Sequence, residues 1–161
     1  MSEVKVSFTL NGEPVEKYVK PNTTLLDLLR RGFKLTGTHK GCDRGDCGAC
    51  TILLDGKPVN SCLILAPKVN NRSVTTVEGL GKPGKLHPLQ EAFIQNHAVQ
   101  CGFCTPGMLL SAKALLDENP HPSREDVKRA KAGNLCRCTG YVQIIDAIMV
   151  AAEKYQRGSR R

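Results

Sequence analysis

The first 20 residues alternate hydrophobic and polar positions with the period of a β-strand. Residues 4–10 carry Val, Val, Phe and Leu at every second position. The dipeptide Asn11-Gly12 favours a two-residue hairpin turn, and residues 15–19 resume the extended pattern. The pattern therefore predicts a β-hairpin at the start of the chain.

A short helix follows this hairpin. Thr23 or Thr24 can cap a helix over residues 25–31, where leucines recur, and Gly32 ends it. A glycine-rich loop separates this helix from the next hydrophobic run. The other regular elements of the first half are predicted to be strands.

Three further strands complete the first half. Residues 51–54 form a strand, Asp55-Gly56 forms a turn, and a returning strand runs through Cys62. A last strand lies near residues 73–77. The expected architecture is a small mixed sheet that holds one helix.

The second half changes to helical periodicity after a glycine-rich linker. We expect helices over residues 88–96, over residues 106–117 with Thr105 as N-cap, and from a capping box of Ser123 and Asp126 to Gly133. A fourth helix covers residues 141–154, with its apolar side chains on one stripe. These four helices predict a bundle. The predicted domains are 1–78, a linker at 79–87, and 88–161 with a basic C-terminal tail.

The eight cysteines fall into two groups of four, which predicts two four-ligand sites. No stretch is long and apolar enough for a membrane span, and the start lacks a signal-peptide core. We therefore expect a cytoplasmic protein, in which thiols stay reduced and a disulfide scaffold is disfavoured. The two groups are Cys42, Cys47, Cys50 and Cys62, then Cys101, Cys104, Cys136 and Cys138.

The formal net charge of +8 could indicate nucleic-acid binding, but bound clusters would reduce it. An iron–sulfur cluster with four thiolates carries about −2, so two clusters would reduce the charge to about +4. The chain has four Phe, three Tyr and no Trp, so no platform for base stacking is evident. The basic residues are interpreted as solvated faces and a tail.

The first cysteine group has the spacing of plant-type ferredoxins, in which three ligands share one loop and the fourth comes from farther on. The Asp55-Gly56 turn sets an antiparallel register that pairs Cys50 with Ser61, so Cys62 arrives beside Cys50. Glycines at 41, 45 and 48 permit positive φ and turn backbone N–H groups toward the site. Zinc would explain four thiolates but not these glycines, so an iron–sulfur site is favoured.

The second group, with two pairs 31 residues apart, suits a zinc site nearly as well by spacing alone. Each pair, however, precedes a predicted helix, the first at Thr105-Pro106 and the second at Gly140-Tyr141. Two helix N-termini then point at one anionic site, and their dipoles favour a negative cluster. The surroundings favour an iron–sulfur cluster here too.

The cysteines stand in three distinctive motifs, which are residues 41–51 (GCDRGDCGACT), residues 100–107 (QCGFCTPG) and residues 134–141 (NLCRCTGY). These motifs closely resemble those of the iron–sulfur subunits of the xanthine oxidase family of molybdenum hydroxylases. The resemblance covers roughly residues 3–155. It implies an α+β chain with an N-terminal β-grasp ferredoxin-like [2Fe–2S] domain and a C-terminal four-helix-bundle [2Fe–2S]-binding domain.

The same resemblance implies an electron-transfer subunit without substrate chemistry of its own. Its partners would be a large molybdenum–pterin subunit and a medium FAD subunit, as a dimer of heterotrimers. Gln100 and Cys138 would contact the pterin, and the first cysteine group would face the flavin. The alternatives are a free-standing diffusible two-cluster ferredoxin and a zinc-binding basic interaction module.

The four histidines do not complete a Rieske-type site, because each group already has four cysteines. They sit at loops or helix ends and are expected to be exposed. Phe103 and Tyr141 are expected to pack beside the second site. The histidines are His39, His87, His97 and His121.

Overall fold

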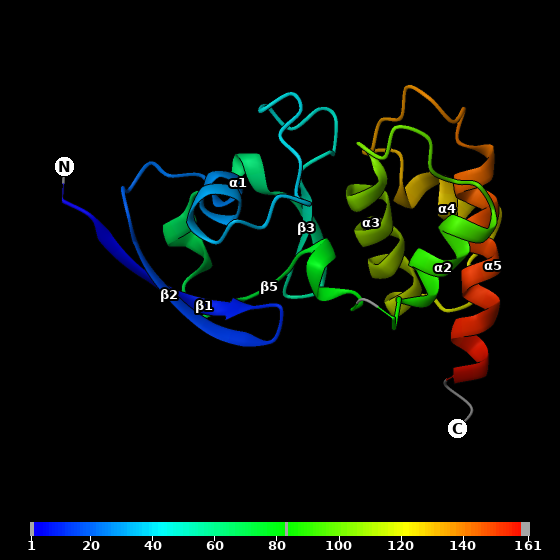
Figure 1. Cartoon of the computed structure of the whole chain (residues 1–161), viewed down its shortest axis with the longest axis horizontal. Helices are drawn as coiled ribbons and strands as arrows, with labels where there is room; N and C mark the ends of the chain where they lie inside the picture. The colour runs from blue at the N-terminus through cyan, green and yellow to red at the C-terminus, as the bar shows by residue number, and fades with distance from the viewer. Residues whose placement is uncertain (1, 83, 159–161) are drawn as a thin grey trace.

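The structure is a computed structural model that describes residues 2–82 and 84–158, without the side chains of 156–158. Strands gather at one end of the molecule and the longer helices at the other (Figure 1). The described chain begins and ends on opposite sides of the molecule, and β3 (Thr51–Leu54) faces α3 (Thr105–Glu118) where the two parts meet. Residues 159–161 of the predicted basic tail, and Pro83 of the linker, lie outside the described residues.

The strands form one mixed sheet in the order β2-β1-β5-β3-β4. The first hairpin pairs Phe8 with Val15 around the Asn11-Gly12 turn, and β1 runs parallel to β5. The second hairpin pairs Thr51 with Asn60, as its turn predicts. The strands are β1 (Val4–Leu10), β2 (Glu13–Val19), β3 (Thr51–Leu54), β4 (Lys57–Asn60) and β5 (Ser73–Thr75).

The helix against this sheet is capped by Thr24, whose Oγ1 accepts a hydrogen bond from Asp27 N at 3.1 Å. Only α1 (Leu25–Asp27) is α-helical, because Leu28–Gly32 widens into a π-helical turn. Three leucines of this segment are buried against β1 and β3 in one apolar core. The helix is thus where the sequence predicts it, but its second half is wound more loosely than expected.

Two predicted strands end early. The returning strand stops at Asn60, and a 3₁₀ turn over Ser61–Leu63 carries Cys62. The last strand stops at Thr75, and a second 3₁₀ turn covers Val77–Gly79. The first turn leads the chain back to Thr23 and Thr24 beside α1, and the second places Val77 against the helical core.

The helical part has its own core, in which Phe93, Met108 and Ile144 are fully buried. Helix α3 starts one residue earlier than predicted, so Thr105 is its first residue and makes no cap. Helix α4 carries the expected capping box of Ser123 and Asp126 but ends three residues earlier than predicted. The helices are α2 (Pro88–Gln95), α3 (Thr105–Glu118), α4 (Arg124–Ala130) and α5 (Val142–Gly158).

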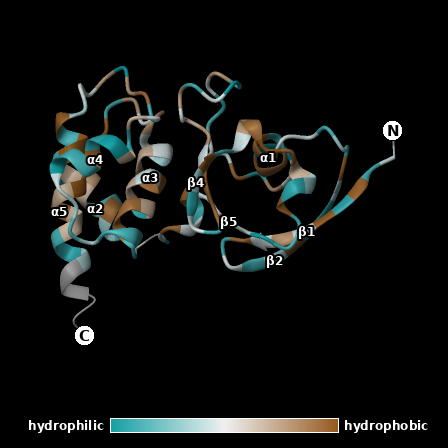
Figure 2. Cartoon of the chain, turned by 180° about the vertical axis from the view of Figure 1, so that it is seen from behind, coloured by the Kyte–Doolittle hydropathy of each residue, from teal (hydrophilic) through white to brown (hydrophobic). Residues whose placement is uncertain are grey.

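Hydrophobic residues colour α1 and parts of β1 and of the bundle brown, beside teal loops (Figure 2). Among the described helices, none is long and apolar enough to cross a membrane. The two cores, one under the sheet and one within the bundle, agree with two domains. Their boundaries at 78 and 88 stay predictions.

His87, at the end of the linker, is half-buried and bonds to both α2 and α5. The prediction that it is exposed is therefore wrong. Its Nδ1 accepts from Leu89 N at 3.3 Å, and its Nε2 lies 2.8 Å from the hydroxyl of Tyr155 on α5. Since Nδ1 accepts, the ring is neutral and Nε2–H donates to Tyr155. Burial lowers the pKa of His87 and raises that of Tyr155, so both groups stay neutral at pH 7.

We expect acid to destabilise the protein through His87. The lowered pKa means that the folded state resists protonation, so stability should be constant above about pH 6.5 and fall below it, down to the folded pKa. The check is the melting temperature between pH 5 and 7 for wild type and His87→Asn, which keeps a capping acceptor without titrating. A variant with the same slope as wild type would assign the acid sensitivity elsewhere.

Candidate metal centres

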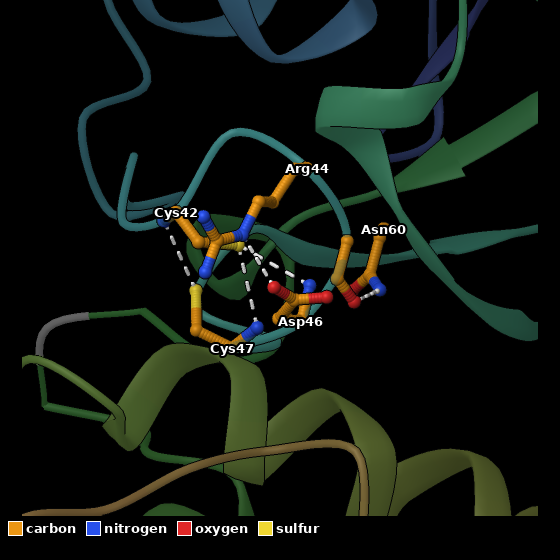
Figure 3. A network of polar contacts seen from close by, with 6 residues as sticks. Cys42, Arg44, Asp46, Cys47 and Asn60 are labelled. Atoms are coloured by element: carbon orange, nitrogen blue, oxygen red, sulfur yellow. Dashed lines mark hydrogen bonds and ion pairs between the residues drawn. The ribbon is translucent and has the colours of Figure 1, made fainter.

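The first three cysteines lie in the loop between α1 and β3, where sulfur atoms meet backbone N–H groups. Cys42 Sγ accepts from Asp46 N at 3.2 Å and Cys47 N at 3.4 Å, and Cys47 Sγ accepts from Cys42 N at 3.3 Å. Figure 3 shows these contacts, with Arg44 and Asp46 forming an ion pair at the edge of the loop. Such N–H groups stabilise negative charge on sulfur.

The loop needs its glycines for two different reasons. Gly45 and Gly48 have φ of +91° and +67°, as predicted. Gly41 does not have positive φ, so that expectation is wrong. It is required for space instead, because a Cβ there would lie 2.7 Å from Cys47 Sγ.

Cys50 and Cys62 come together behind this loop. Ser61 lies opposite Cys50 and donates to its carbonyl from both N (3.3 Å) and Oγ (2.8 Å). Cys50, Cys62 and Leu26 form a small buried cluster. The hairpin register thus places Cys62 beside Cys50, where the sequence predicts the fourth ligand.

Ionisation differs sharply within the first group. Hydrogen bonds from the backbone N–H of Arg44 and Cys47 lower the pKa of Cys42 to about 6. Burial raises the pKa of Cys62 to about 12. A coordinated metal deprotonates a thiol outright, so this group can supply four thiolates only around a cation.

The second group forms two pairs, one exposed and one half-buried. Cys101 and Cys138 are exposed, and their Sγ atoms lie 3.5 Å apart. Cys104 and Cys136 are half-buried and lie near each other. Three of these cysteines, Cys101 and Cys104 before α3 and Cys136 before α5, border a cavity of about 420 Å³. Phe103, Leu135, Arg137 and Tyr141 complete its lining.

The half-buried pair is also split in acidity. Burial raises the pKa of Cys104 to about 12. Burial opposes ionisation of Cys136 too, but the hydroxyl of Thr139, 3.1 Å from its Sγ, and nearby backbone N–H groups lower its pKa to about 7. Tyr141 holds the same turn, because its hydroxyl accepts from Cys136 N at 2.9 Å. The site is therefore prepared for anionic sulfur.

The pairing of thiols fits a two-iron cluster. Across the described residues, no three His, Cys, Asp or Glu side chains gather closely enough to hold a single metal ion. A [2Fe–2S] cluster instead takes two thiolates on each of two irons. Each cysteine group supplies four sulfurs as two close pairs, which is the donor set that such a cluster needs.

Gln100 and Cys138 both lie on the exposed side of the second group. The Gln100 side chain makes no hydrogen bond to any other described residue, so its amide is available at the surface. Their predicted contact with a pterin stays a prediction.

Asn134 connects the two cysteine loops, which the sequence does not indicate. Its buried amide donates to Gly48 O at 2.9 Å and to Thr51 Oγ1 at 3.0 Å, and its Oδ1 accepts from Ser111 at 2.6 Å. Next to it, Leu135 N donates to Cys47 O at 2.9 Å. We call this set, together with Gly107 and Gly133, the interdomain contact.

Two glycines allow the loops to approach this closely. A Cβ on Gly48 would lie 2.2 Å from Gly133 O, and one on Gly107 would lie 2.4 Å from Gly48 O. Both distances are far below van der Waals contact. The two cysteine groups are thereby held in a fixed relation to each other.

His39 and Phe103 add a second link between the loops. The rings stack with centroids 4.7 Å apart, and His39 Nδ1 donates to Phe103 O at 2.8 Å. Phe103 does pack beside the second group, but His39 is half-buried and bonded rather than simply exposed. Of the four histidines, His97 and His121 are exposed as predicted.

Comparison with known proteins agrees with this geometry. Residues 8–73 match the profile of the 2Fe-2S iron-sulfur cluster binding domain, and residues 76–149 match that of the [2Fe-2S] binding domain. The chain is 47% identical over 154 residues to the nicotinate dehydrogenase small FeS subunit of Eubacterium barkeri, covering 96% of this chain and 98% of that protein. It is 52% identical over 148 residues to the nicotine 6-hydroxylase small subunit of Paenarthrobacter nicotinovorans, covering 92% and 89%.

Solved structures share the whole fold. A chain of quinoline 2-oxidoreductase from Pseudomonas putida 86 superposes with a TM-score of 0.94 at 51% identity, covering 98% of this chain and 99% of that one. The aldehyde oxidoreductase from Desulfovibrio desulfuricans ATCC 27774 gives a TM-score of 0.92 at 52% identity. This chain corresponds to 17% of that longer polypeptide. The predicted α+β class, with a ferredoxin-like domain first, is confirmed.

Proposed function

Since this chain belongs to the small iron–sulfur subunits of the xanthine oxidase family of molybdenum hydroxylases, we propose that it relays single electrons between a molybdenum–pterin site and FAD in partner subunits. It is the electron-transfer subunit of an oxidoreductase and performs no substrate chemistry itself. Each [2Fe–2S] cluster, when bound, stores one electron at a time.

The observation that carries this proposal is the pairing of two four-thiol sites through the interdomain contact. Cys47 is joined through its carbonyl to Leu135, the neighbour of Cys136. The protein therefore holds the two sites close and at a fixed separation, which a two-station relay requires. We assign the first cluster to Cys42, Cys47, Cys50 and Cys62, and the second to Cys101, Cys104, Cys136 and Cys138.

We assign the pterin side to the second site. Gln100 and Cys138 are both exposed, and Cys101, the neighbour of Gln100, has its Sγ 3.5 Å from that of Cys138. The family resemblance implies a pterin contact through Gln100 and Cys138. The first site would then face the flavin. Relatives described as small subunits have larger partners, and we propose a dimer of heterotrimers in the cytoplasm, where the thiols stay reduced.

A diffusible ferredoxin is the alternative, but the surface around the cysteines favours a bound partner. Leu63, Phe103, Leu135 and Val142 all lie near the cysteine motifs and are 63%, 47%, 56% and 56% exposed. Apolar side chains gathered around a functional site mark an interaction surface. A basic zinc module would leave both the cluster-domain matches and this surface without a role.

Metal analysis tests the proposal directly. The chain should carry four irons and four acid-labile sulfides, with a red-brown colour, because each group supplies the four thiolates of one cluster. The measurement is iron, zinc and sulfide content per chain after anaerobic purification. Two irons per chain, or zinc in place of iron, would overturn the assignment.

A further inference from the structure

Lys131 is a largely buried residue whose charged side chain lies close to the second cysteine group. It follows the last residue of α4, and only 7% of its surface is exposed. Within the part of the chain that the structure describes, no carboxylate forms an ion pair with it. Its ammonium group is only partly withdrawn from water, and no carboxylate of the described residues offsets that partial desolvation.

The contacts of Lys131 lead to the second site. Its Nζ lies 4.1 Å from the centroid of the Tyr141 ring, a cation–π contact. Tyr141 lines the cavity beside the cysteines, and its hydroxyl accepts from Cys136 N. One aromatic ring therefore connects the ammonium group to a ligand loop of the second site.

A structural role alone does not account for a cation here. The end of α4 already has Lys128 and Arg129 in its last turn, both exposed, and these complement the helix dipole. An apolar residue of similar length would fill the same space without the desolvation cost. The negative charge that would compensate Lys131 is that of the cluster itself. Burial lowers the pKa of Lys131, and the negative charge of the Cys136 thiolate opposes this by favouring the charged ammonium. Negative charge at the second site therefore stabilises this cation.

We propose that Lys131 is a positioning residue that raises the reduction potential of the second cluster. Reduction adds one negative charge to the cluster, and a partly desolvated cation nearby stabilises that charge. The residue touches neither the cluster nor a substrate, and it acts through its charge and through Tyr141. This inference rests on the proposed electron-transfer function.

The test is a redox titration of both clusters, followed by electron paramagnetic resonance, in the intact complex. Lys131→Met should shift the second cluster to a more negative potential. A tenfold loss of the reduced form at fixed potential would correspond to about 59 mV for one electron. Lys131→Arg keeps the charge and should stay near the wild-type value, and Lys131→Gln provides a second neutral variant should the Met variant fold poorly.

The outcomes separate the inference from the function on which it rests. The two signals are distinguished with Cys47→Ser, which removes the first. An unchanged second potential in both neutral variants, or equal shifts of both clusters, would overturn the role of Lys131 while leaving the relay intact. Absence of two cluster signals in the wild-type protein would instead overturn the relay.

Discussion

Replacing Cys47 with serine in the assembled enzyme should stop the reduction of FAD by substrate while the second cluster is still reduced rapidly. Cys47 is assigned to the first cluster, which faces the flavin in the proposed order. Only its side chain changes, so its carbonyl still accepts from Leu135 N, and the second site keeps its neighbour. The variant should therefore lose the first cluster and keep the second.

The measurement is rapid mixing with an oxidisable substrate, with the second cluster followed by its spectrum and the flavin by its absorbance. Arg44→Gln is the matched control, because Arg44 lies in the same loop, is exposed and, among the described residues, forms its one ion pair with Asp46. It should retain both clusters and rapid flavin reduction. Fast flavin reduction without the first cluster, in an otherwise intact complex, would reverse the assigned order. A reductase would run the same path backwards.

The second large effect concerns the interdomain contact. Gly48→Ala should destabilise the protein by about 2–5 kcal/mol, the sum of a left-handed backbone for a residue with a Cβ and an overpacked interior. The new Cβ would lie 2.2 Å from Gly133 O and 2.6 Å from Asn134 Nδ2. The two loops must then separate, which breaks the hydrogen bonds of Asn134.

Two other glycines make this test specific. Gly56→Ala is the control for backbone strain alone, because Gly56 has φ of +80° but a Cβ there would meet no atom within 4 Å. It should cost only about 1–2 kcal/mol. Gly107→Ala approaches the same contact from α3, where alanine would otherwise stabilise a helix by about 1 kcal/mol.

We therefore expect Gly107→Ala to destabilise despite the better helix propensity. The check is the melting temperature of the cluster-loaded protein under anaerobic conditions. The loops are not held by the interdomain contact if two results are found together. The melting temperature of Gly48→Ala would fall no further than that of Gly56→Ala, and that of Gly107→Ala would be unchanged or raised.

Local features of the fold could be read from the sequence. The two hairpins follow from their Asn-Gly and Asp-Gly turns, and the register of the second places Cys62 beside Cys50. Thr24 as a cap and Ser123 with Asp126 as a capping box are equally local. In each case the residues that determine the structure lie within about ten positions of each other.

Features that depend on distant residues could not be predicted. Asn134 is 86 residues from Gly48, and nothing in the pattern around it marks a buried, bonded amide. The space that requires Gly41 exists only once Cys47 is in place. The sequence predicts an exposed His39 because its partner, Phe103, lies in the other half of the chain. Pairwise contacts of this kind leave no periodic trace in the sequence.

The interdomain contact also has a consequence for the order in which the protein matures. A chain emerges from the ribosome N-terminus first, and its N-terminal domain generally folds first. The Gly48 loop would thus be synthesised well before Gly133 and Asn134, the residues that seat it. Until they are made, the loop of the first cysteine group lacks its contacts with Gly133 and Asn134. The final packing of the first cysteine loop is therefore completed only after the last motif of the second group has been translated.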